Sequence, residues 1–165
     1  ESDNMIELKP VPLNKGERDF IEDIKAFYTA SGNFFVDKEL YVLRNQSRKG
    51  IGFFESSNFY PDFIVWLVIG NKQYVTFVDP KGLRNLRGLE DDKINLHKTI
   101  RETIEPRLND KDIVLNSFII SNTPFAEIEF WEKGITIEAF NDKHVFFQTE
   151  QKKIYIEKML RKLIQ

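Results

Sequence analysis

Asp62, Asp79 and Lys81 are the residues whose types and spacing could do chemistry together. Two neighbouring carboxylates offer the hard oxygen ligands that Mg²⁺ prefers. A bound metal would polarise a phosphate and acidify its water, while a lysine ammonium would position that water or stabilise developing charge. These three residues therefore predict metal-assisted hydrolysis of a phosphoester.

Two β-prone apolar runs flank these residues and predict a hairpin. Residues 63–69 directly follow Asp62, residues 74–78 directly precede Asp79, and Gly70-Asn71 supplies the turn between them. The first run is continuous and apolar, so we expect a central strand that is buried on both faces.

The hairpin would bring the two acids together. If Ile69 pairs with Lys72, Asp62 lies opposite Asp79 on one face, with Cβ atoms about 4.5 to 5.5 Å apart. Lys81, two residues beyond Asp79, projects from the same face. A turn shifted by one residue would break this pairing.

The acid-x-Lys spacing by itself carries little information, because the chain contains it five times, starting at Glu7, Asp23, Asp79, Asp91 and Glu150. An ordinary ion pair is the alternative interpretation of each. Only the Asp79 instance ends an apolar strand that folds back toward a Pro-Asp pair, and this position favours a metal site there.

The remaining pattern predicts a mixed α/β fold (α+β, mixed sheet). Apolar spacing and turn residues indicate helices at 15–30, 89–105 and 154–164, strands at 40–43, 113–120 and 145–147, a polar loop at 45–52, and a short helix after Thr123-Pro124. Asn14 is the expected N-cap of the first helix, and Pro106 the expected end of the second. We expect one domain, 1–165, with an α-β-β-β-α-β core over 15–120 and a helical/β appendix over 121–165. The start without methionine indicates a fragment of a longer chain or an added tag.

Composition excludes several classes of function. The chain has 41% hydrophobic residues, enough for one core, and no cysteine, so disulfides and cysteine-based metal sites are excluded. No apolar run is long enough for a membrane span or signal peptide, so we expect a cytoplasmic protein without a membrane partner. No phosphate loop of nucleotide motors and no serine-hydrolase elbow occurs. The net charge is −2, but the charge is unevenly distributed, and the segments 38–49 and 81–101 are basic.

Pro61-Asp62 followed by Asp79-Pro80-Lys81, within this order of elements, resembles the PD-(D/E)xK nuclease superfamily of restriction endonucleases. More narrowly, residues 52–63 and 78–82 resemble the C-terminal endonuclease domain of type III restriction enzymes and related helicase-linked nucleases. The resemblance covers about residues 15–120 and implies a restriction-endonuclease-like core.

The resemblance implies a Mg²⁺-dependent DNA endonuclease, with Mn²⁺ as a substitute. Asp62, Asp79 and the Pro80 carbonyl would bind the metal, and Lys81 would assist the attacking water. Superfamily members often add a glutamate from the first helix, and Glu17 shares the face of that helix that carries its apolar residues. The alternative role of Glu17 is a capping box with Asn14.

The resemblance also implies that polar residues of the second helix support the site, and Lys93 and His97 would share one face of that helix. A packed or half-exposed histidine is the alternative for His97. Glu55 could add acidity near the site.

Basic residues beside the site could bind the DNA backbone: Arg44, Arg48, Lys49, Arg84 and Arg87. Solvated loop charge is the alternative for each. The implied partners are DNA, a helicase/ATPase region of the same chain, and a modification subunit. Two competing functions stay open: a non-catalytic DNA-binding or scaffold module with the same fold, and a metal-dependent hydrolase of small phosphoesters, which would need a closed pocket.

Overall fold

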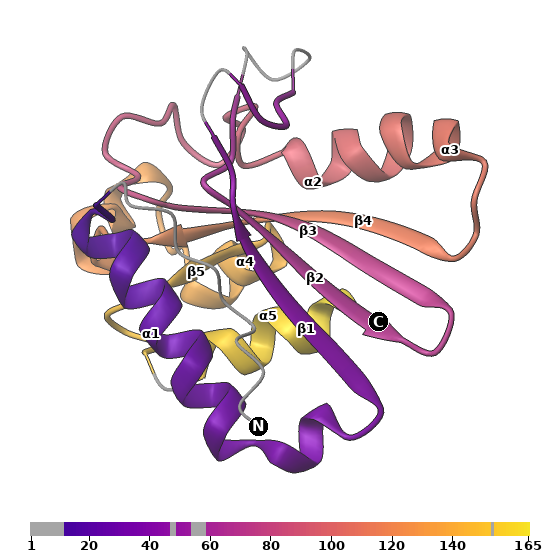
Figure 1. The fold of residues 1–165 in the computed structure, drawn as a ribbon. Coiled ribbons are helices and arrows are strands. Elements are labelled where there is room, and N and C mark those ends of the chain that lie inside the picture. Colours follow the sequence, from indigo (N-terminus) through magenta and orange to yellow (C-terminus); the bar gives the residue numbers. More distant parts are fainter. Residues whose placement is uncertain (1–11, 47–48, 54–58, 153) are drawn as a thin grey trace.

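The computed structural model describes residues 12–46, 49–53, 59–152 and 154–165. The protein is an α/β protein whose five-stranded mixed sheet, in the order β1-β2-β3-β4-β5, is flanked by helices (Figure 1). The strands are β1 (Lys38–Arg44), β2 (Phe63–Ile69), β3 (Lys72–Lys81), β4 (Ile113–Ser121) and β5 (Val145–Phe147). None of the helices in these ranges combines the length and apolarity needed to cross a membrane.

Helix α1 (Lys15–Ala30) confirms the first predicted helix, including both of its ends. The Asn14 side chain accepts a hydrogen bond from the Glu17 N–H at 2.9 Å, and the Glu17 carboxylate accepts one from the Asn14 N–H at 3.0 Å. This reciprocal capping box fixes the start of the helix. The helix ends at Ser31, where a short 3₁₀ turn, η1 (Gly32–Phe35), leads to β1.

The hairpin of β2 and β3 has the predicted register. Ile69 pairs with Lys72, and the antiparallel ladder runs to the pair of Phe63 with Val78. The expectation that residues 63–69 are buried on both faces is wrong. Phe63, Val65 and Leu67 lie in the main core, whereas Trp66 on the opposite face is 37% exposed. The cause is that the helices on that face pack against β4 and leave part of β2 uncovered.

The second predicted helix, 89–105, has different bounds. Residues 89–95 form turns, and the helix runs through α2 (Leu96–Thr99), the π-helical turn η3 (Ile100–Ile104) and α3 (Glu105–Leu108). Pro106 does not end it, because this proline lies in the first turn of α3, where a missing N–H costs little. Lys93 therefore precedes the helix that carries His97, and the two do not share a helical face.

Strand β4 lies parallel to β3, and β5 lies parallel to β4 at the edge of the sheet opposite β1. Along the chain, β4 is followed by the 3₁₀ turns η4 (Phe125–Glu127) and η5 (Glu129–Trp131) and by helix α4 (Ile137–Asp142), which precede β5. Helix α5 (Tyr155–Leu163) follows β5. The short helix after Thr123-Pro124 is thus a single 3₁₀ turn. The strand predicted at 145–147 and the terminal helix predicted at 154–164 are confirmed.

The C-terminal segment, expected to be an appendix to the core, contributes to its centre. Helices α1 and α5 cover the same face of the sheet (Figure 1), and α5 buries five side chains there. Tyr155 in α5 also donates a hydrogen bond to Asp23 in α1 at 2.7 Å. An amphipathic helix at the chain end therefore completes the main hydrophobic cluster.

Leu160→Ala tests whether α5 is part of the core. Leu160 is fully buried, so its truncation should lower the free energy of unfolding by about 2 to 5 kcal/mol. The neighbouring exposed Lys158→Ala should change the free energy by less than about 0.5 kcal/mol. Urea denaturation followed by circular dichroism measures both, and equal stabilities for the two variants would contradict a core role for α5.

Candidate metal-dependent hydrolytic site

Asp62, Asp79 and Lys81 meet at one edge of the sheet. Asp62 directly precedes β2, and Asp79 and Lys81 lie in the last three residues of β3. Carrying the hairpin register one pair beyond Phe63 and Val78 places Asp62 opposite Asp79, and their carboxyl groups share a hydrogen bond. The structure thus brings the three residues together on one face.

Burial makes this carboxyl pair retain a proton. Loss of hydration raises the pKa of Asp62 to about 8, and the charge of Asp79, the shared hydrogen bond and the charge of Glu17 act in the same direction. The Lys81 ammonium opposes the shift. Since Asp79 is only 5% exposed, two adjacent negative charges would have little water to screen them. A cation that replaces the proton would relieve the repulsion.

Lys81 is held between Asp79 and an aromatic ring. Its ammonium forms an ion pair with Oδ2 of Asp79 and lies 4.6 Å from the centre of the Phe59 ring. Phe59 is fixed by two backbone hydrogen bonds with Phe53, at 2.8 and 3.1 Å. The Lys93 ammonium lies 5.9 Å from the same ring, so Lys93 reaches this site from the turn before α2.

Glu17 lies close enough to raise the pKa of Asp62 by its charge, but its carboxylate already has two partners. Besides the capping hydrogen bond from Asn14, Oε2 of Glu17 forms an ion pair at 3.2 Å with the guanidinium of Arg44. The Glu17 and Arg44 side chains are 9% and 22% exposed. The capping role is therefore present, and Arg44 is an internal partner at the border of the site.

The donor set suits a magnesium ion that keeps most of its water. Oδ2 of Asp79 is buried, and its partner is the Lys81 ammonium. Successive carbonyls of a strand point in opposite directions, and the Lys81 carbonyl faces β4, where the Asn122 N–H binds it. The Pro80 carbonyl therefore faces the side of Asp62. Within the described ranges, no group of three or more Asp, Glu or His side chains is arranged to hold a metal. Two carboxylates, one carbonyl, water and a substrate phosphate would be typical of Mg²⁺.

His97 is not brought to this site. Its ring stacks on His144, with centroids 4.1 Å apart, and His144 stacks in turn on Phe118 at 4.6 Å. Nδ1 of His97 lies 2.8 Å from the Ile94 carbonyl oxygen. Burial lowers the pKa of His97 and is the main reason that the pKa of His144 falls to about 3. The packed-histidine alternative therefore describes His97.

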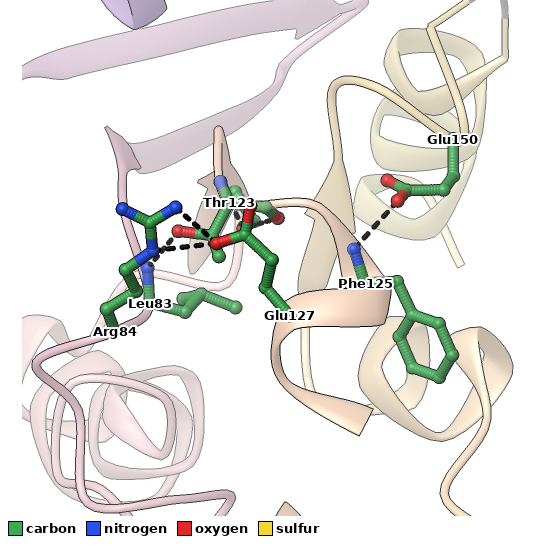
Figure 2. A network of polar contacts seen from close by, with 7 residues as sticks. Leu83, Arg84, Thr123, Phe125, Glu127 and Glu150 are labelled. Carbon is green, nitrogen blue, oxygen red and sulfur yellow. Dashed lines mark hydrogen bonds and ion pairs between the residues drawn. The ribbon is translucent and has the colours of Figure 1, made fainter. Parts of the chain in front are cut away.

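The basic residues that were expected to bind the DNA backbone differ from one another in their surroundings. Lys49 and Arg87 are exposed, and Arg84 is exposed but bound to Glu127 (Figure 2). Arg48 and Glu55 lie outside the described residues.

Asn45, which the sequence indicated only as the start of a loop, positions Asp62. Its backbone N–H donates to the Asp62 carbonyl at 2.8 Å, and its side-chain Nδ2 donates to the carbonyls of Pro61 and Ile51 at 2.8 and 2.7 Å. A methyl group at Gly50 would lie 2.0 Å from Oδ1 of Asn45, so the loop needs glycine there. The only signal in the sequence was an asparagine directly after a strand, near two glycines.

The site therefore contains Asp62, Asp79, Lys81 and Lys93, bordered by the pair of Glu17 and Arg44. Neither the protein-family models, nor the curated proteins, nor the solved structures include a match for this chain.

Asp62→Asn tests the shared proton through the pH dependence of stability. The folded protein keeps a proton on Asp62 up to about pH 8, while the unfolded chain releases it near the ordinary value of 3.8. Wild-type stability should therefore lose this contribution as the pH rises between these two values. The asparagine variant should exceed wild type in melting temperature by a margin that grows from pH 5 to 8 and then levels off. Thermal melts in EDTA measure this margin, and a constant difference would contradict the proton assignment.

Proposed function

We propose that this chain is a Mg²⁺-dependent DNA endonuclease that hydrolyses phosphodiester bonds. The observation that carries the proposal is the contact of Asp62 with Asp79, with Lys81 paired to the Asp79 carboxylate at the end of β3. A structural ion pair would need one acid and one lysine, whereas here a second acid is held against the first. Two apposed acids on a β hairpin favour a cation as their common partner.

Each side chain has a task that suits phosphodiester hydrolysis. Asp62 and Asp79, with the Pro80 carbonyl, would hold Mg²⁺, which supplies Lewis-acid polarisation of the phosphate and a more acidic water. The Lys81 ammonium, fixed between Asp79 and the Phe59 ring, would orient the attacking water and stabilise negative charge that develops on the phosphate. Asn45 would hold the backbone of Asp62 in place.

A polyanionic substrate is supported by the cations around the carboxylates. Lys93 forms no ion pair with another described residue, although it lies near the ring that also contacts Lys81. Lys49 and Arg87 add exposed positive charge in loops that begin or end near this edge. A nucleic-acid backbone would supply the phosphates that such cations neutralise.

The order α1, β1 to β3, α2 to α3, β4 supports a restriction-endonuclease-like core. On that basis we extend the proposal to the cleavage region of a type III-like restriction enzyme. Such a region would work with an ATPase region of the same chain and a modification subunit.

A plasmid-cleavage assay with Mg²⁺ tests the proposal. Wild type should cut in Mg²⁺ or Mn²⁺ and stop in EDTA, while Asp62→Asn and Asp79→Asn should show no metal-dependent cutting. Lys81→Ala should lower the cleavage rate by about 100- to 1,000-fold, because a charge-stabilising donor is lost. Lys152→Ala is the matched control, an exposed lysine at the same spacing after Glu150, and should cut like wild type.

Equal cutting by wild type, Asp62→Asn and Lys81→Ala would remove the proposed site. A folded wild-type protein that binds DNA without cutting it would instead identify a non-catalytic module.

A further inference from the structure

Asn122 is a polar residue beside the candidate site, and the proposed function gives it no role. It directly follows β4, and its backbone N–H donates to the Lys81 carbonyl at 3.1 Å. Its side chain is exposed, whereas its neighbours Ser121 and Thr123 are only 1% and 4% exposed. A single amide therefore projects from buried backbone next to the proposed catalytic lysine.

The backbone on both sides of Asn122 is fixed by hydrogen bonds. The Ser121 hydroxyl donates to the Thr123 carbonyl at 2.8 Å and accepts from the Thr123 N–H at 3.1 Å. The Thr123 hydroxyl accepts from the Leu83 N–H at 3.0 Å, which ties the turn after β4 to the turn after β3 (Figure 2). Nearby, the Glu150 carboxylate accepts from the Phe125 N–H at 2.7 Å. The position of Asn122 relative to Lys81 is thus set by the fold.

Two glycines make room for the Asn122 side chain. A methyl group at Gly16 would lie 2.8 Å from its Nδ2, and one at Gly82 would lie 3.3 Å from its Oδ1. The amide is therefore seated between the first turn of α1 and the turn after Lys81. It forms no hydrogen bond with any side chain or backbone group in the part of the chain that the structure describes. Its NH₂ group is available to a ligand.

We infer that the Asn122 amide donates a hydrogen bond to the nucleic-acid phosphate next to the one that is cut. The inference rests on the proposed function and adds a substrate contact to it. Strands β3 and β4 are parallel neighbours that end side by side, with Lys81 on one face and Asn122 on the other, so a nucleic-acid strand that crosses their carboxyl ends would contact both residues. Asparagine amides are common donors to phosphate oxygens.

The contact positions the substrate and does not take part in hydrolysis. Alternation along the strands sends Lys81 toward the face of Phe77, while the Asn122 amide lies beside Gly16 of α1, on the other side of the sheet edge. The loss of Asn122 should therefore weaken substrate binding and leave the maximal rate unchanged.

Cleavage rates measured over a range of duplex DNA concentrations in Mg²⁺ test this role. Asn122→Ala should raise the half-saturating DNA concentration about tenfold, the effect of losing one hydrogen bond to a charged group. Asn122→Asp should raise it further, because the added charge repels phosphate. Gly16→Ala should raise it as well, because the new methyl group displaces the amide without changing Asn122. Asn33→Ala, an exposed amide beyond the other end of α1, is the control and should match wild type.

Wild-type half-saturation in both Asn122→Asp and Gly16→Ala would overturn this inference and leave the proposed nuclease intact. A lower maximal rate at unchanged half-saturation would overturn it too, because Asn122 would then act in the chemical step. Absence of cutting by wild type would overturn the proposed function and this inference with it. Circular dichroism melts establish that each variant is folded.

Discussion

The register of β2 against β3 is the constraint on which the rest of the structure depends. Side chains alternate between the two faces of a strand, so a slip of one residue would turn every side chain of β2 to the other face. Phe63, Val65 and Leu67 would then leave the main core, at a cost of roughly 1.5 to 3 kcal/mol each. That cost far exceeds the repulsion of one carboxylate pair that shares a proton. The hydrophobic core therefore holds the two acids together.

This register places two carboxyl groups that repel each other at the edge of the sheet. Asp62 and Asp79 cannot both ionise easily in a partly buried place, and Lys81 relieves the repulsion only in part. Glu17 in the first turn of α1 adds negative charge nearby, but its ion pair with Arg44 at the end of β1 balances that charge. With its shared proton, the carboxylate pair carries one negative charge, which Lys81 balances. Ionisation of the second carboxyl would add a charge without a partner, and under the proposed function a divalent cation takes up that charge.

The second half of the chain gives this edge its rigidity. Strand β4 continues beside the end of β3, and the turns that follow the two strands are joined by Thr123 and Leu83. Helix α5 completes the core under the sheet, and Gln148 after β5 donates a hydrogen bond to the Gly16 carbonyl at the start of α1. Residues far apart in the sequence thus fix the few positions at which a substrate would be bound.

The sequence by itself determined the elements with strong local signals. The capping pair of Asn14 and Glu17, the Gly70-Asn71 turn and the apolar runs around it predicted α1, the hairpin and its register, and through the register the meeting of Asp62 with Asp79. These features depend on contacts between residues near one another in the chain. Only the tertiary structure decided which side chains surround these two acids and which partners the other candidate residues have. Arg44 became the partner of Glu17, His97 stacked on His144, Lys93 reached the Phe59 ring from a turn, and Asn122 was seated between Gly16 and Gly82. Each of these contacts joins distant segments whose packing no local period or motif encodes.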